Sequence, residues 1–223
     1  MDTSAPVRIL TVCTGNICRS PVAERLLQAG LDQVVLGGFQ VTSAGTRAMV
    51  GYPMQPISAN IVRTFGGDPE GFLARQLTPQ ILRGVDLVLT MTSGHRGEVL
   101  QLDASLLKRT FTIREFARML DVLDGQASAS GGQVPVIPAA KGTDDNDSLA
   151  ATAAFWKSLP ARAAGVRHLA LPPDAADNDI IDPYRRSAEV YRQMEDELAP
   201  AIVSILRHAR LNAPVRGSRA GSL

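Results

Sequence analysis

Cys13 and Arg19 have the residue types and the spacing that phosphoryl transfer to a sulfur atom requires. The five residues between them form a loop long enough for successive backbone N–H groups to point at one centre and hold an oxyanion. The same positive field favours the thiolate of Cys13, which is the nucleophilic form. The planar guanidinium of Arg19 fits two oxygens of a phosphoryl group. A lone cysteine after an apolar strand is often only a small buried side chain, so the spacing needs its context.

The context is a strand, a short loop and a helix start near the beginning of the chain. Residues 7–13, VRILTVC, are an apolar run typical of a buried strand. Ser20 and Pro21 are suited to opening a helix. The apolar residues that follow have helical spacing: Val22, Ala23, Leu26 and Leu27. The candidate loop therefore lies between the carboxyl end of a strand and the amino end of a helix, where an anion is favoured.

The string VCTGNICRSP at this junction resembles the phosphate-binding loop of the low-molecular-weight protein tyrosine phosphatases. The resemblance implies that Cys13 is the nucleophile and that Arg19 clamps the phosphate. It also implies that Ser20 hydrogen-bonds the Cys13 sulfur and that Ser43, in the small-residue turn SAGT, hydrogen-bonds Asn16. The loop residues expected around the phosphate are Thr14, Gly15, Asn16, Ile17, Cys18 and Ser20.

A second stretch, IIDPYRRS, resembles the general-acid loop of the same family. Transfer to a thiolate releases an aryloxide that must be protonated, and a carboxylic acid in a partly desolvated crevice can do this. That role is expected of Asp182, with Tyr184, Ala48 and Met49 lining the substrate crevice. This form of the loop is similar to bacterial members paired with tyrosine kinases of polysaccharide export. A tyrosine-phosphorylated protein, or such a kinase, is therefore the expected partner.

The chain departs from the family pattern in two places. Phe72 stands where the family commonly has a histidine, so a supporting hydrogen bond to the phosphate loop is expected to be missing. Residues 121–178 form an unusual insertion, in which the composition of 125–148 predicts a mobile loop. Phe155 and Trp156 are expected to dock part of the insertion. Docking near the crevice would make it a lid or a specificity wall, and docking on the far side of the sheet would make it decoration.

Alternation of apolar strands and amphipathic helices predicts an α/β fold, an open four-stranded parallel sheet with helices on both faces and the phosphate-binding loop after the first strand. The strands are expected at 7–13, 39–42, 85–91 and, at an edge, 110–113. A helix is expected over 53–65, and Pro200 is expected to kink or interrupt the last helix. The domain should span 7–211, between a flexible start at 1–6 and a flexible tail at 212–223.

Composition limits the partners. The 23 basic and 22 acidic residues nearly cancel, which argues against nucleic acid and anionic membrane surfaces as partners. Both cysteines lie in one loop and the three histidines are scattered, so neither a disulfide scaffold nor a zinc site is expected, and no cofactor or metal is needed. Without a signal pattern or a membrane-spanning run, the protein is expected to be cytoplasmic.

Two other functions remain to be weighed. Arsenate reductases share this fold and loop but use further cysteines outside the loop, and this chain has only Cys13 and Cys18. A phosphotyrosine-binding module without catalysis would normally have lost the nucleophile or the acid, and both are present. Cys18 itself is either a buried thiol that fills space in the loop or a partner for a protective disulfide with Cys13.

Overall fold

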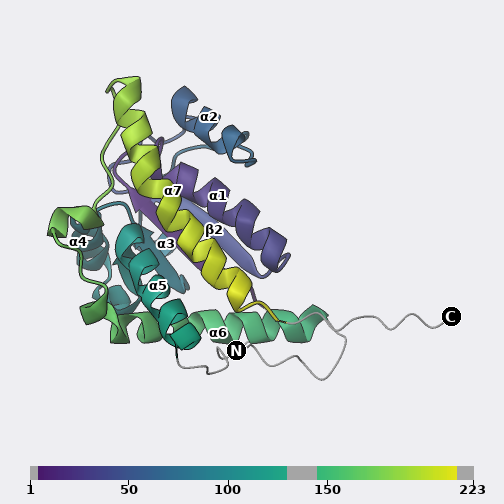
Figure 1. Cartoon of the computed structure of the whole chain (residues 1–223). Helices are drawn as coiled ribbons and strands as arrows, with labels where there is room; N and C mark the ends of the chain where they lie inside the picture. The colour runs from purple at the N-terminus through teal and green to yellow at the C-terminus, as the bar shows by residue number, and fades with distance from the viewer. Residues whose placement is uncertain (1–4, 130–144, 215–223) are drawn as a thin grey trace.

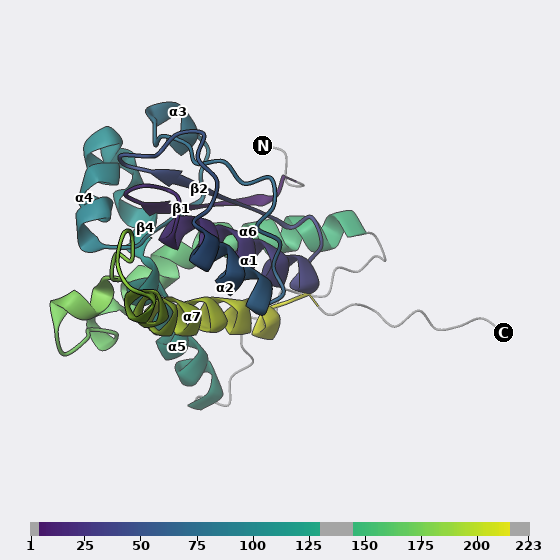
Figure 2. The ribbon, with the colours of Figure 1, turned by 90° about the horizontal axis from the view of Figure 1, so that it is seen from above.

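The computed structural model describes residues 5–129 and 145–214. Its centre is a four-stranded parallel sheet in the order β2-β1-β3-β4 (Figures 1 and 2). The strands are β1 (Val7–Cys13), β2 (Phe39–Gly45), β3 (Leu87–Thr90) and β4 (Thr110–Thr112). The predicted fold class is therefore confirmed, with β4 at an edge of the sheet.

The sheet forms because β1 is apolar on both of its faces. Val7 and Ile9 join one buried cluster, whereas Leu10 and Val12, which point to the opposite face, join a second one. A strand buried on both faces needs a cover of helices on each side, which is the arrangement found in parallel sheets.

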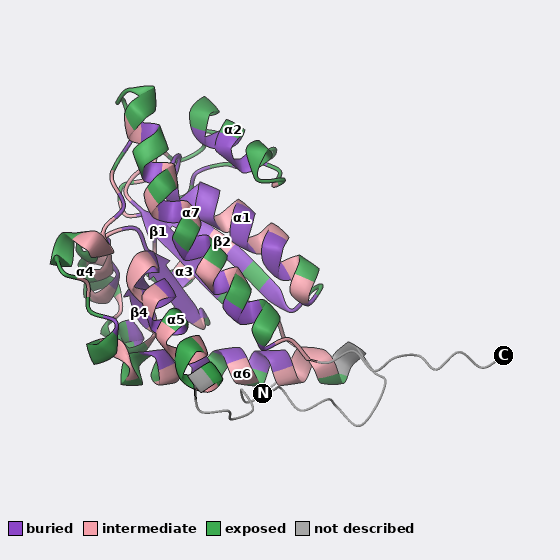
Figure 3. Cartoon of the chain, viewed as in Figure 1, coloured by how far each residue is buried: buried purple, intermediate pink, exposed green. Residues whose placement is uncertain are grey.

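More helices cover one face of the sheet than the other. The larger cluster lies under the helices α1 (Arg19–Val34), α5 (Ile113–Ala129) and α7 (Ala188–Leu211), with α2 (Pro56–Thr64) packed against α1 and α7. The smaller cluster lies under α3 (Pro79–Leu82), α4 (Ser93–Leu102) and the 3-10 helix η1 (Ala104–Arg109). Figure 3 shows the buried residues concentrated in the strands and on the helix sides that face them.

Two helix predictions differ from the structure. The helix expected over 53–65 is the shorter α2, and only part of its apolar face is buried: Ile57 is 41% exposed and Phe65 is 52% exposed. The predicted interruption of the last helix at Pro200 is wrong, since α7 continues through this residue, and the alternative of a kink there stays a prediction. Buried side chains on both sides of Pro200, among them Leu198 and Ile202, hold the two halves of α7 against the core.

The insertion is more helical than its composition predicts. Helix α5 runs through Gly125 to Ala129, and α6 spans Asp145–Gly165, so the loop predicted at 125–148 is wrong at both of its ends. The remaining part of that prediction, 130–144, lies outside the described residues. Tertiary contacts stabilise the end of α5, because Asp121 pairs with Arg207 at 2.6 Å and Asp124 pairs with His208 at 2.6 Å.

Helix α6 packs at the amino end of the sheet, far from Cys13. The buried Trp156 ring lies edge-on to Phe39, the first residue of β2, with 5.0 Å between ring centroids. Cys13 ends β1 at the opposite, carboxyl end of the sheet, six residues along the strand from the partner of Phe39, or about 20 Å away. Figure 1 shows α6 crossing this amino end of the sheet. Phe155 and Trp156 thus dock the insertion, as predicted, but on the side away from the candidate loop.

The chain then returns to the carboxyl end of the sheet through two 3-10 helices, η2 (Arg167–Leu169) and η3 (Ala175–Asn178). Arg118 on α5 holds the returning segment by donating to the carbonyls of Ala170 and Asp177 and to the Asn178 side chain. The segment therefore reaches Asp182 along α5 rather than across open solvent.

The ends of the chain are largely outside the described residues, which exclude 1–4 and 215–223. Asn212 is described and is buried, and its side chain donates to the His208 carbonyl at 2.8 Å. The flexible tail predicted from residue 212 is therefore wrong at that residue. No helix within 5–129 and 145–214 is long and apolar enough to cross a membrane.

Trp156→Ala should lower the free energy of unfolding by about 3 to 5 kcal/mol, because it removes a fully packed ring from the junction of α6 and β2. Phe155→Ala is the matched control and should cost less, since Phe155 is only half-buried. Urea unfolding followed by circular dichroism measures both. A loss below about 1 kcal/mol for Trp156→Ala would contradict the packing of α6 on the sheet.

Candidate active site

The loop after β1 is held so that its N–H groups face inward. Its carbonyls are taken up by the next segment of chain: Thr46 N–H donates to the Cys13 carbonyl at 2.9 Å, and Arg47 N–H to the Thr14 carbonyl at 3.0 Å. Met49 N–H likewise donates to the Gly15 carbonyl at 3.0 Å. Because these carbonyls point outward, the loop leaves its N–H groups and the start of α1 for an anion on the inner side.

Asn16 fixes the curl of this loop. Its backbone is left-handed, with φ of 55°, which few residues other than glycine adopt as readily as asparagine. The side chain donates to Ser20 Oγ at 2.9 Å and to Ser43 Oγ at 2.8 Å, and its Oδ1 accepts from Arg75 N–H at 2.8 Å. The contact between Ser43 and Asn16 is the one that the family resemblance implies.

The sulfur of Cys13 lies inside the curled loop and is buried. Asn16 N–H donates to it at 3.3 Å, and Ser20 Oγ is 3.0 Å from it. The structure thus brings Ser20 to the sulfur, as expected. Both groups can donate a hydrogen bond to this sulfur.

Arg19 and Asp182 meet at the mouth of the loop, although 163 positions separate them in the chain. Arg19 Nη2 lies 2.7 Å from Asp182 Oδ2, and Nη1 donates to the Ile180 carbonyl at 3.1 Å. The guanidinium is buried, whereas the Asp182 side chain is 50% exposed. Arg19 Nε is buried without a hydrogen-bond partner among the described residues, which leaves one donor for an oxyanion.

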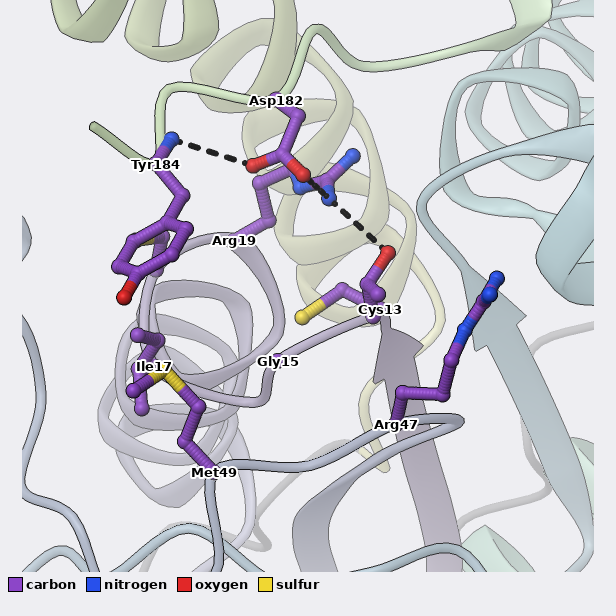
Figure 4. A pocket seen from close by; sticks show the side chains of 10 residues that line it. Cys13, Gly15, Ile17, Arg19, Arg47, Met49, Asp182 and Tyr184 are labelled. Atoms are coloured by element: carbon purple, nitrogen blue, oxygen red, sulfur yellow. Dashed lines mark hydrogen bonds and ion pairs between the residues drawn. The ribbon is translucent and has the colours of Figure 1, made fainter. Parts of the chain in front are cut away.

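A pocket opens above Cys13 between this ion pair and the segment 47–49 (Figure 4). Ile17, Met49 and Tyr184 lie together on one side of it, and Arg47 lies on the other. Ala48, expected to line the crevice, does not: it turns toward Gly45, and its N–H donates to Gln76 Oε1. The full lining is Cys13, Thr14, Gly15, Ile17, Cys18, Arg19, Arg47, Met49, Asp182 and Tyr184.

Phe72 is buried beside the guanidinium of Arg25, and its side chain gives the loop no hydrogen bond. Glu24 and Arg75 supply the outer contacts instead. Ser43 Oγ donates to Glu24 Oε2 at 2.5 Å, and Arg75 Nε donates to the Ser43 carbonyl at 2.6 Å. Burial raises the pKa of the Glu24 carboxyl. Sequence reasoning missed both residues, because neither belongs to the loop motif.

Cys18 lies on the inner side of the loop, next to the last helix. Its sulfur is 3.7 Å from the Tyr191 hydroxyl. Burial raises the pKa of the Cys18 thiol to about 11, so it remains protonated near neutral pH. Of the two cysteines that line the pocket, Cys18 is therefore the one that burial holds as a thiol.

His95 is a further buried residue of the site that sequence reasoning set aside as scattered. It is 5% exposed, and its Nε2 lies 2.8 Å from Thr14 Oγ1 in the loop. Burial, and then the nearby charge of Arg19, lower the pKa of His95 to about 4. Its position five residues after the end of the buried β3 was the only signal in the sequence. Among the described residues, no group of three or more histidine, cysteine or acidic side chains could hold a metal ion.

Residues 8–127 match the family model described as "Low molecular weight phosphotyrosine protein phosphatase". This is more than half of the chain. The chain belongs to this family. The phosphatase is 35% identical over 116 residues to the low molecular weight protein-tyrosine-phosphatase Etp of Escherichia coli, a match that covers 52% of this chain and 75% of Etp. Enzymes of this family are hydrolases, and so is this phosphatase.

Solved structures agree on the fold. The tyrosine phosphatase AmsI of Erwinia amylovora superposes with a TM-score of 0.56 at 23% identity, covering 90% of this chain and 91% of AmsI. The YwlE arginine phosphatase of Geobacillus stearothermophilus gives 0.55 at 26% identity, covering 91% and 92%. The family match ends at residue 127, so the position of Asp182 at the pocket rests on the geometry of this phosphatase.

The phosphatase should lose stability as the pH falls from about 6.5 to about 4, and His95 should account for part of the loss. The folded state disfavours the protonated ring, so its contribution is complete above the unfolded pKa of 6.5 and is lost as the pH approaches 4. A shift of this size corresponds to at most about 3 kcal/mol.

Denaturant unfolding at several pH values, compared between the wild type and His95→Gln, measures this loss. The variant should show a shallower decline, and His168→Gln, which removes an exposed histidine, is the matched control. If the free energy of unfolding depends on pH in the same way in the wild type and in His95→Gln, protonation of His95 does not destabilise the folded state.

Proposed function

We propose that this phosphatase hydrolyses phosphotyrosine in proteins, and small aryl phosphates, through a cysteinyl-phosphate intermediate. Cys13 is the nucleophile, Arg19 holds the phosphoryl oxygens and Asp182 is the general acid and base. The observation that supports this most is the meeting of all three at one pocket, with Arg19 Nη2 2.7 Å from Asp182 Oδ2 above the Cys13 sulfur. Asp182 comes from a segment beyond the family match. Its position at the pocket is therefore support that is independent of that match.

In the first step, the phosphate dianion of the substrate enters the loop and replaces Asp182 as the partner of the Arg19 guanidinium. Asp182 is then released from its ion pair and can serve as the general acid. The Cys13 thiolate attacks phosphorus as the bond to the aryl oxygen breaks, and Asp182 gives its proton to the departing oxygen. The inward N–H groups and Arg19 stabilise the charge on the equatorial oxygens.

In the second step, the Asp182 carboxylate takes a proton from water as the water oxygen attacks phosphorus. The bond from phosphorus to the Cys13 sulfur breaks, and the thiolate leaves. Ser20 Oγ, 3.0 Å from that sulfur, stabilises the leaving thiolate by donating a hydrogen bond. Inorganic phosphate is then free to dissociate.

The wall of the pocket supports an aromatic substrate. Ile17, Met49 and Tyr184 offer apolar surface on one side, and Arg185 stacks on the Tyr184 ring with its guanidinium carbon 5.2 Å from the centroid. A tyrosyl ring can pack against such a wall, whereas the charged guanidinium of phosphoarginine would lose hydration there. The proposed partner is thus a tyrosine-phosphorylated protein, a tyrosine kinase among the candidates, and we propose a cytoplasmic location.

The two rival functions have less support. An arsenate reductase of this fold needs cysteines beyond the loop, and Cys13 and Cys18 are the only cysteines of the chain. An inactive phosphotyrosine-binding module has no need of a carboxylate at the pocket, and Asp182 is there.

Cys13→Ser should abolish turnover of every aryl phosphate, because the hydroxyl is a far weaker nucleophile than a thiolate. Asp182→Asn should lower kcat for phosphotyrosine about 100-fold or more and affect nitrophenyl phosphate, which has a good leaving group, far less. Asp196→Asn, the same change on the exposed face of α7, is the control and should leave kcat unaltered. Equal losses across leaving groups would remove Asp182 from the acid role, and a preference for phosphoarginine would replace the proposed substrate.

Peroxide should inactivate the enzyme reversibly if Cys18 protects Cys13. The Cys13 thiolate takes one oxygen from peroxide to give a sulfenic acid, and the Cys18 thiol displaces water from it to form a disulfide. An added thiol should then restore activity in the wild type but not in Cys18→Ala, where Cys13 oxidises further. Equal recovery in both would leave Cys18 as a buried thiol that only fills the loop.

A further inference from the structure

His95 touches the phosphate-binding loop but has no part in the mechanism described above. It is the third residue of α4, which reaches the site from the opposite face of the sheet to α1. Both ring nitrogens lie at hydrogen-bond distance from threonine hydroxyls, Nδ1 at 2.8 Å from Thr92 Oγ1 and Nε2 at 2.8 Å from Thr14 Oγ1. A buried ring with both nitrogens engaged is fixed in orientation.

The donors and acceptors around His95 determine which ring nitrogen carries the proton. Thr92 caps α4, and its Oγ1 accepts the backbone N–H of His95 at 3.1 Å. The hydroxyl proton of Thr92 then needs an acceptor, and among the described contacts the acceptor is Nδ1 of His95. Nδ1 is therefore unprotonated, so the neutral ring carries its proton on Nε2 and donates it to Thr14 Oγ1.

Thr14 Oγ1 thus accepts on the side away from the pocket. The guanidinium of Arg19 also faces it, with Nη2 at 3.5 Å. With His95 and Arg19 both donating, the lone pairs of this oxygen are occupied and its own proton remains to be donated. Thr14 lines the pocket above Cys13, where an incoming oxyanion can accept this proton.

We propose that the Thr14 hydroxyl is a further donor to the bound phosphoryl group and that His95 is the positioning residue that turns its proton into the pocket. The proposal rests on the proposed function, because it needs phosphate in this loop. The Thr14 hydroxyl, held in this way, is one more donor to the phosphoryl group in addition to the backbone N–H groups and Arg19.

The neutral state of the ring is consistent with this role. The charged groups that face His95 are Arg19, Glu98, Asp182 and Asp179, and burial with the cation of Arg19 outweighs the three carboxylates in lowering its pKa. The ring therefore keeps one acceptor for Thr92 and one donor for Thr14 over the pH range in which a thiolate enzyme works.

Binding of inorganic phosphate to the full chain, measured by titration calorimetry, tests the proposal without relying on turnover. Thr14→Val removes the hydroxyl at constant shape and should weaken phosphate binding about tenfold or more, the usual effect of losing a hydrogen bond to a charged group. Thr14→Ser keeps the hydroxyl and should bind nearly as well as the wild type. Unchanged affinity in Thr14→Val would overturn the proposal.

His95 is tested by what its variants do through Thr14. His95→Met fills the site without a donor and should weaken phosphate binding about as much as Thr14→Val, and the double variant should be no worse than either. His95→Gln, whose amide can accept from Thr92 and donate to Thr14, should restore most of the affinity. Additive losses in the double variant, or full affinity in His95→Met, would show that His95 does not act through Thr14.

The outcomes separate this proposal from the proposed function. A wild type that binds phosphate but hydrolyses no aryl phosphate would contradict the proposed function and leave the Thr14 measurement meaningful. A wild type that hydrolyses phosphotyrosine while Thr14→Val binds phosphate equally well would contradict only the present proposal.

Discussion

The site depends on one constraint, the curl of the loop between Cys13 and Arg19. A five-residue loop does not point its N–H groups at one centre unless its carbonyls have partners elsewhere, because buried carbonyls must be paired. On the outside of the loop, backbone N–H groups of the segment 46–49 donate to these carbonyls. Inside the loop, Asn16 adopts the left-handed turn. The side chain of Asn16 ties the loop to α1, β2 and the segment before α3 at once. The anion site is therefore a property of three elements rather than of the motif alone.

The second requirement is a carboxylate at the mouth, and the chain meets it in spite of a long insertion. The segment before Asp182 is fixed at several points: Ile180 N–H donates to the Met91 carbonyl at 2.8 Å, and Asp179 accepts from Ser93 N–H at 2.7 Å. Arg114 on α5 donates to the Asp179 carbonyl at 3.0 Å. Since these anchors are the residue that follows β3 and residues of α4 and α5, the position of Asp182 is set by the common fold and not by the inserted residues.

The sequence predicts the parts of this structure that have a local signal. Apolar runs place the strands, and the motif around Cys13 places the loop and the residues that meet in it. The sequence does not predict the roles of Glu24, Arg75 and His95. Their contacts with the loop are long-range, and each alone is an ordinary helix or loop residue. The helix end at 125–129 is not predicted for a related reason, since α7 supplies the partners of Asp121 and Asp124 and tertiary contacts override a composition that favours a loop.

The same physics explains why the insertion can be long without disturbing the site. Its apolar residues, led by Trp156, are buried against the amino end of the sheet, whereas ligands of parallel sheets gather at the carboxyl end. Added chain length costs little closure entropy once both ends are held, and here Arg118 and the pair formed by Arg167 and Glu115 hold the returning end. Changes in this interval therefore alter the amino-end surface of the domain, whereas the positions of Cys13, Arg19 and Asp182 depend on contacts at the carboxyl end of the sheet.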